Sequence, residues 1–201
     1  LLALANDASE KVRYQLLCTS SVLKNTQKAD KAIGTVLTRD IKDKWVHIAA
    51  LAASSGRETQ LLAMALKQLA DKETKAQESF FAYTAATIAN SQNPEGIRQL
   101  MSLALDAKAN GAIRASLLTG LQQLWSRTGV PVALTDQEKK TLLDQFTSQN
   151  DPALRHAALQ LLRVVGLPQQ ADHFIKTQAL PVITNQQANE AFRSDAIYLL
   201  S

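Results

Sequence analysis

The 201-residue chain has a single cysteine, Cys18, only 7 glycines and 5 prolines, and 5% aromatic residues. One cysteine excludes an intrachain disulfide, so the sequence indicates no redox compartment. Its place in the apolar run Leu16-Leu17-Cys18 predicts a small buried residue. So few glycines and prolines argue against an all-β protein built from many tight turns. No stretch approaches the roughly 20 apolar residues of a transmembrane helix, so we expect no membrane insertion.

Several motifs that carry common chemistries are also missing. The haem-attachment pattern Cys-x-x-Cys-His is absent, so we expect no haem to be held covalently by this segment. The glycines are scattered and form no phosphate-binding loop. None of the three histidines, His47, His156 and His173, lies beside another histidine or a cysteine at metal-ligand spacing. We therefore expect no catalytic residue, no bound cofactor and no metal site.

The charge balance is mild, because 22 basic and 18 acidic residues give a net charge of +4. The richest basic run, formed by Lys24, Lys28 and Lys31, is interrupted by Asp30. A nucleic-acid-binding surface usually shows a basic stripe, so we interpret this run as a solvated helix face. Nucleic-acid binding is kept as an alternative, which a steep fall of binding with salt would favour.

Alanine and leucine dominate the chain, and 46% of its residues are hydrophobic. Because both residues favour helices and let them pack closely, the composition predicts an all-α protein with a substantial core. A six-residue pattern recurs at intervals of 30 to 41 residues, the length of a two-helix repeat. It consists of an apolar residue, Arg or another polar residue, any residue, usually a small residue, and two mostly apolar residues. The copies occupy residues 12–17, 46–51, 76–81, 113–118, 154–159 and 192–197.

Residues that cap helix N-termini precede most copies of this pattern. They are Asp7, Asp43, Asp71, Asn110, Asp151 and Asn189. Their side chains can accept hydrogen bonds from the free N–H groups of a first helical turn. Second helices are expected between the copies, where apolar residues recur at helical spacing. We place them at about 28–39, 57–70, 94–107, 135–148 and 169–179, with an apolar loop that includes Pro131 at 129–134 and an irregular stretch at 181–187.

These elements predict a right-handed α-α superhelix of about five helical hairpins plus a partial sixth. One hairpin is too small to bury its apolar face, so stacking on its neighbours creates a continuous core. No shift in composition divides the chain, so we expect a single segment over residues 1–201. Solenoid ends usually carry polar caps, and the apolar stretches at 1–5 and 196–200 therefore predict truncation at both ends from a longer chain.

An arginine occupies the second pattern position in four of the six copies. These residues are Arg13, Arg114, Arg155 and Arg193. We expect each to reach an acidic or carbonyl group in the adjacent repeat and so to form a structural ladder. Binding of a ligand by these arginines is the alternative.

The pattern Asp-x-x-x-x-Val-Arg followed by an Ala/Leu-rich run resembles the HEAT repeat. The match is good at Asp7–Leu17 and Asp151–Leu162 and poor at residues 71–90. This resemblance implies an armadillo-like α-solenoid, a fold that binds proteins along an extended surface. We therefore expect a non-catalytic protein-interaction scaffold. Its docking surface is expected on the second helices near 57–70, 94–107 and 135–148.

Two classes of HEAT-like enzyme provide further alternatives. HEAT-like di-iron hydroxylases carry repeated His-Glu dipeptides, but the three histidines here precede Ile48, Ala157 and Phe174. HEAT-like DNA glycosylases need a carboxylate together with aromatic and basic residues around one site. We interpret Trp45 and Trp125 as packing residues, which disfavours that activity.

A narrower resemblance rests on two stretches of the sequence. The first is Leu4-Ala5-Asn6-Asp7 followed by Val12-Arg13-Tyr14-Gln15-Leu16, and the second is Asp43–Leu51, where His47 replaces an expected Arg. Over residues 1–55 the chain is similar to the HEAT segment of large secreted bacterial proteins. There the segment lies between a propeller-type sugar-dehydrogenase-like domain and a cytochrome c-like domain. The similarity implies a periplasmic or extracellular spacer whose partners are other domains of the same polypeptide or another protein. A contribution to the active site of the adjacent redox domain is an alternative.

Overall fold

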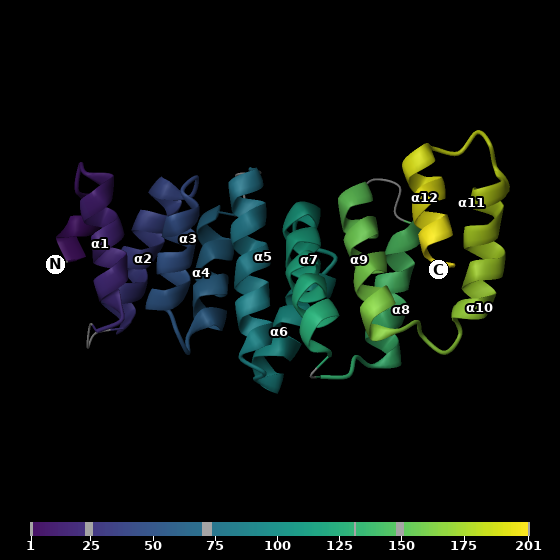
Figure 1. Ribbon diagram of the computed structural model, residues 1–201, viewed down its shortest axis with the longest axis horizontal. Helices are drawn as coiled ribbons and strands as arrows, with labels where there is room; N and C mark the ends of the chain where they lie inside the picture. The colour runs from purple at the N-terminus through teal and green to yellow at the C-terminus, as the bar shows by residue number, and fades with distance from the viewer. Residues whose placement is uncertain (1, 23–25, 70–73, 131, 148–150, 201) are drawn as a thin grey trace. The chain divides into compact units, whose positions relative to one another are not determined.

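The computed structural model describes residues 2–22, 26–69, 74–130, 132–147 and 151–200 (Figure 1). These residues are mostly helical and include no β-strand, which confirms the all-α class. Within the same ranges, no helix is both long enough and apolar enough to cross a membrane. Some positions used in the predictions above lie outside the described part of the chain: Lys24, Asp71, Pro131, the first residue of the stretch 1–5, the last residues of the expected helices 57–70 and 135–148, and residues 72 and 73 of the stretch 71–90.

Contacts gather into two compact units, Leu1–Ser91 and Gln92–Ser201, here called unit 1 and unit 2. Unit 1 contains η1 (Leu2–Asn6), α1 (Glu10–Ser20), α2 (Thr26–Asp40), α3 (Lys44–Ala53), α4 (Glu58–Leu69) and α5 (Lys75–Asn90). Helix α3 packs between α1 and α5, and α2 packs against α4. The odd-numbered helices of unit 1 therefore form one layer and the even-numbered helices a second (Figure 1).

Unit 2 repeats this alternation. It contains α6 (Pro94–Leu105), α7 (Gly111–Thr128), α8 (Asp136–Asp144), η2 (Gln145–Thr147), α9 (Pro152–Val165), α10 (Ala171–Phe174), the π-helical segment η3 (Ile175–Ala179), α11 (Leu180–Thr184) and α12 (Glu190–Tyr198). Helix α9 packs against both α7 and α12 in one layer, and α8 packs behind α9. All six pattern copies fall within α1, α3, α5, α7, α9 and α12.

Side-chain caps explain where several of these helices begin. In each confirmed cap, the side-chain oxygen accepts a hydrogen bond from a backbone N–H in the first turn. The confirmed caps are Asp43, Asn110, Asp151 and Asn189. The prediction for Asp7 was wrong, because Ser9 is the N-cap residue of α1. Asp7 Oδ1 instead accepts a bond from the Ser9 N–H at 2.8 Å.

The C-terminal hairpin differs from the expectation of an irregular stretch at 181–187. Helical structure continues from Ala171 to Thr184 through η3. Pro181 cannot donate a backbone hydrogen bond, yet it is tolerated in the first turn of α11, directly after the wider π turns. The break after α7 lies where it was expected, because Gly129 ends that helix with a positive φ of 82° that favours glycine.

The core of each unit comes from the faces that the two layers turn toward each other. In unit 1, the largest fully buried side chains include Leu17, Ile33, Leu37, Leu62, Phe80 and Phe81. In unit 2, they include Ile97, Leu100, Met101, Trp125 and Phe146. Leucine and alanine supply most of the remaining buried positions, which keeps neighbouring helices close together.

Candidate functional site

Arg13 is buried and ties together three parts of unit 1. Its Nε and Nη2 donate hydrogen bonds to both carboxylate oxygens of Asp40, each at 2.6 Å. Its Nη1 donates to the carbonyl oxygens of Asp7 at 2.7 Å and Ala8 at 3.0 Å. The bond to Asp40 raises the pKa of Arg13 above its ordinary value. Arg13 therefore joins α1 to the end of α2 and to the turn that precedes α1.

The other pattern arginines have different partners. Arg114 donates from Nε to the carbonyl of Ala104 in α6 at 3.0 Å, and burial lowers its pKa. Arg155 donates from Nε to Asp195 in α12 at 2.6 Å. The Nε of Arg193 is buried and has no hydrogen-bond partner among the described residues. Two of these arginines thus reach neighbouring helices, and the ladder as a complete set stays a prediction.

Among the described histidines, His156 has the surroundings most like those of a catalytic imidazole. Asp195, which pairs with Arg155, also lies 2.9 Å from His156 Nδ1. A carboxylate at this position can orient an imidazole as a general base. However, the second ring nitrogen of His156 lies 2.6 Å from the side-chain amide nitrogen of Gln160. The two ring nitrogens thus face the side chains of Asp195 and Gln160 and not a serine, threonine or cysteine that the imidazole could activate as a nucleophile.

His47 lies inside unit 1 and serves the packing of α3. Its Nε2 lies 2.6 Å from the carbonyl oxygen of Ile41, and its ring packs edge-on against Phe80 with centroids 5.5 Å apart. Its Nδ1 is buried and without a hydrogen-bond partner in the described part of the chain. Burial lowers the pKa of His47, because a charged ring would be poorly solvated there.

Two expectations about single residues were wrong. Trp125 is buried, as expected for a packing residue, but the Trp45 side chain is 55% exposed. Cys18 is also exposed rather than buried. Cys18 of α1 and Trp45 of α3 are thus exposed on the odd-numbered layer of unit 1.

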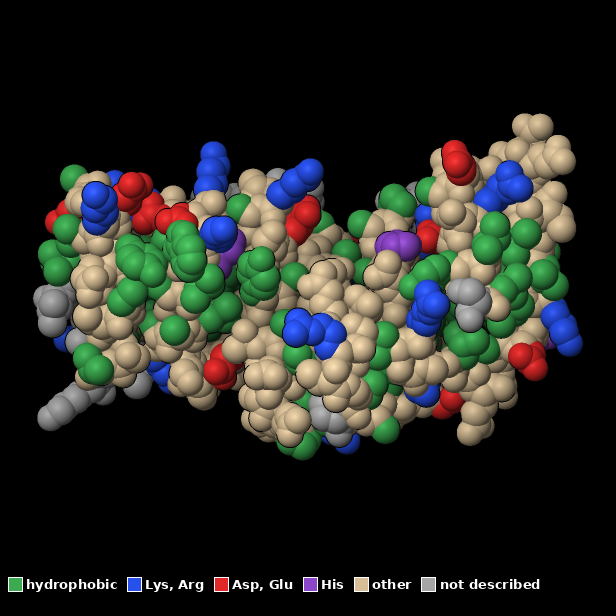
Figure 2. Space-filling view, in the orientation of Figure 1, with side chains coloured by type: hydrophobic (Ala, Val, Ile, Leu, Met, Phe, Trp, Pro, Cys, Tyr) green, Lys and Arg blue, Asp and Glu red, His purple; other side chains and the backbone are tan. Residues whose placement is uncertain are grey.

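A groove of about 830 Å³ lies at the N-terminal ends of α1 and α3, where the α2–α3 turn and the start of α5 complete its lining. We call it the α1–α3 groove. Its lining includes Lys11, Tyr14, Ile41, Lys42, Trp45 and Val46. Beyond it, Ile48 of α3 and Tyr83 of α5 are 52% and 51% exposed. Figure 2 shows hydrophobic side chains gathered over α1 and α3, with charged side chains along one edge.

Helical geometry explains why these side chains share one face. Trp45 and Ile48 are three residues apart on α3, and Tyr14 and Cys18 are four apart on α1, so each pair lies on the same side of its helix. Asp43 fixes the start of α3 by accepting the Trp45 N–H at 2.9 Å. The ammonium of Lys44 lies 5.5 Å from the Trp45 ring centroid, within cation–π range.

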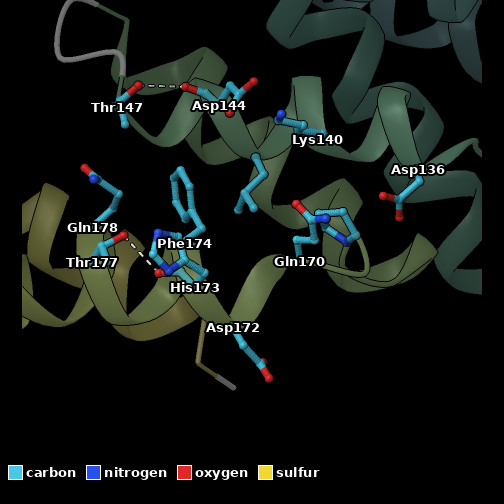
Figure 3. A pocket seen from close by; sticks show the side chains of 12 residues that line it. Asp136, Lys140, Asp144, Thr147, Gln170, Asp172, His173, Phe174, Thr177 and Gln178 are labelled. Atoms are coloured by element: carbon cyan, nitrogen blue, oxygen red, sulfur yellow. Dashed lines mark hydrogen bonds between the residues drawn. The ribbon is translucent and has the colours of Figure 1, made fainter.

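Unit 2 has a pocket of its own, of about 670 Å³, between the α8–η2 segment and the α10–η3 segment (Figure 3). Phe174 points toward α8 and packs edge-on against Phe146, with ring centroids 5.8 Å apart. Asp136 accepts a hydrogen bond of 2.9 Å from the Gln169 N–H and so fixes the segment that leads into α10. The titratable lining residues are Asp136, Lys140, Asp144, Asp172 and His173, and all of them are exposed. Exposed charges interact weakly, so this pocket favours no acid–base chemistry.

Within the described ranges, no group of three or more His, Cys, Asp or Glu side chains could hold a metal ion. Comparisons of the chain with protein-family models, curated proteins and solved structures found no match.

Proposed function

We propose that this chain is a non-catalytic scaffold, a right-handed HEAT-like solenoid over residues 1–201 that binds other proteins or domains. The regular alternation of layers within each unit supports the proposal, because equivalent helices pack in the same way from hairpin to hairpin. The position of every pattern copy in the same class of helix supports it further.

The observation that best supports a binding function is the exposure of Trp45, Ile48 and Tyr83 on the odd-numbered layer of unit 1. Trp45 and Ile48 lie on α3, and Tyr83 lies on α5, which packs against α3. Large exposed apolar side chains gathered on one surface commonly mark interaction sites. Tryptophan and tyrosine are also enriched among the residues that dominate binding energy. Meanwhile, the buried charged groups Arg13 and Arg155 are engaged in ion pairs that hold helices together.

The surface of the second helices gives less support to a docking role. Their outward positions are polar, as at Gln60 and Lys67 of α4 and at Arg98 and Gln99 of α6. Docking on those helices stays a prediction, and the first helices of unit 1 are the better-supported surface.

The proposal extends to a spacer role in a larger multidomain protein. The similarity of residues 1–55 to the HEAT segments of secreted propeller and cytochrome c-type proteins favours an extracytoplasmic setting. In such a protein the segment would hold neighbouring domains apart or dock one of them. The redox chemistry would belong to those domains.

Hydrogen exchange tests this function directly. Exchange is measured on the 201-residue chain alone and on the full-length protein encoded by the open reading frame that contains it. We expect slower exchange in the longer protein along helices with outward apolar side chains, because docking suppresses local opening. Identical exchange along every helix, together with no binding by the isolated chain, would contradict the scaffold function.

A further inference from the structure

We infer that the α1–α3 groove binds a short segment of a protein partner in which acidic side chains lie next to large apolar ones. The inference rests on the proposed scaffold function and gives it a docking site and a partner chemistry. The shape of the groove, its aromatic lining and the distribution of paired and unpaired charges around it support the inference.

The groove offers apolar contact in a hollow rather than on a flat patch. It encloses about 830 Å³, and its lining includes Tyr14 of α1 and Trp45 of α3. Ile41 and Val46 contribute to its lining and are buried. Aromatic side chains in such a setting bind large apolar groups of a partner at a low cost in conformational entropy.

The carboxylates around the groove are largely engaged within the protein. Both oxygens of Asp40 accept hydrogen bonds from Arg13. The side chain of Asp43 accepts the backbone N–H of Trp45. Glu10 is the acidic lining residue without such a bond among the described residues.

The lysines around the groove are not engaged in this way. Lys11, Lys42 and Lys44 are exposed, and none forms an ion pair with another described residue. Arg13 compensates the charge of Asp40, so the remaining carboxylates, Glu10 and Asp43, are outnumbered by these lysines and by the exposed lining residue Arg39. Electrostatic complementarity favours a partner with acidic side chains, which these lysines would attract and orient.

Two other occupants fit less well. A second copy related by twofold symmetry would place the same lysines opposite each other, which like charges disfavour. An anionic membrane surface would meet Glu10, Asp40 and Asp43 as well as the lysines. A narrow peptide can also enter the hollow and contact Ile41 and Val46 in its lining, whereas a flat lipid surface cannot.

The test starts with a phage library of random peptides selected on the 201-residue chain. Enriched peptides are synthesised, and their affinity is measured by calorimetry. We expect them to combine Asp or Glu with Leu, Phe or Trp. Trp45→Ala should weaken binding by about 30-fold, the loss typical of a central interface residue. Ile197→Ala is the matched control, because Ile197 is 53% exposed on α12 of unit 2.

A charge exchange tests the acidic chemistry separately. The double variant Lys42→Glu/Lys44→Glu should bind the selected peptides about 10-fold more weakly or worse. Peptides with their acidic residues changed to lysine should recover affinity for that variant alone. Trp45→Phe provides a milder second variant, and circular dichroism shows that each variant remains helical.

Several results would overturn the inference or a part of it. Peptides that bind Trp45→Ala as tightly as the parent chain would overturn the groove site and leave the scaffold function standing. Enriched peptides without acidic residues would overturn the partner chemistry. Trp45-dependent binding to phosphatidylserine vesicles without peptide binding, or a dimer abolished by Trp45→Ala, would overturn the inference in favour of a membrane or a second copy. Absence of any peptide ligand, with unchanged hydrogen exchange in the longer protein, would remove both proposals.

Discussion

The ion pair between Arg155 and Asp195 joins α9 to α12 inside unit 2, and its removal gives a measurable effect. The two side chains are only 4% and 7% exposed, and the Nε–Oδ2 distance is 2.6 Å. Asp195→Asn keeps the size of the side chain but removes its charge, which leaves the Arg155 guanidinium buried without its counter-ion. Breaking a buried pair in this way costs about 3–5 kcal/mol.

We expect Asp195→Asn to lower the free energy of unfolding by about 3 kcal/mol, near the lower end of that range. The Arg155 guanidinium would still contact the Phe192 ring, whose centroid lies 4.8 Å from it. The double variant Arg155→Met/Asp195→Asn should be more stable than the sum of the single changes suggests, since no buried charge is then stranded. A double-mutant cycle should therefore give a coupling energy of about 1–3 kcal/mol.

Urea unfolding followed by tryptophan fluorescence measures this effect. In a Trp45→Phe background, Trp125 is the remaining tryptophan and reports on unit 2. Asp30→Asn is the control and is followed by circular dichroism, because the Asp30–Arg57 pair lies in unit 1; this pair is more exposed and should contribute less than about 1 kcal/mol. A loss below about 1 kcal/mol for Asp195→Asn, equal to that of the control, would refute the reasoning.

Three further predictions concern single residues. Stability should fall as the pH drops below about 6.5, by up to about 1.4 kcal/mol per pH unit, because the unfolded chain protonates His47 while burial lowers its pKa in the fold. This loss should level off below the lowered folded pKa, and urea titrations of His47→Asn should show a smaller pH dependence. Gly111→Ala should cost about 1 kcal/mol in urea unfolding, because the added methyl would collide with the Asp151 side chain that caps α9; no loss of stability would contradict this contact. Cys18 should react with a thiol reagent in the folded chain at a rate close to that of the urea-unfolded chain, because it is exposed; strong protection would contradict its placement.

The local features of this fold were largely predictable because they depend on neighbours in sequence. Asp43 and Asp151 mark helix starts through bonds to residues two or three positions ahead, so a short sequence window contains the whole interaction. The repeated apolar pattern indicated which segments become the first helix of each hairpin, and all copies lie in such helices. The continuation of the helix through Pro181 was missed, because a proline normally ends a helix and no local signal indicated the π turns before it.

The exposure of Trp45 shows where local patterns no longer decide. Helix α3 is apolar around most of its circumference, so its periodicity does not indicate which stripe faces the core. Packing of α1 and α5 on either side of α3 buries Val46 and His47 and leaves Trp45 and Ile48 outside. No residue near Trp45 in the sequence carries that information.

From the sequence alone came the all-α class, the hairpin period and most helix starts, because propensity, spacing and capping act within a few residues. Only the tertiary structure decided which carboxylates pair with the buried Arg13 and Arg155, since Arg13 and Asp40 are 27 residues apart and Arg155 and Asp195 are 40 apart. It also decided which of two apolar helix faces stays in water. That choice depends on which neighbouring helices cover the surface, and it created the α1–α3 groove.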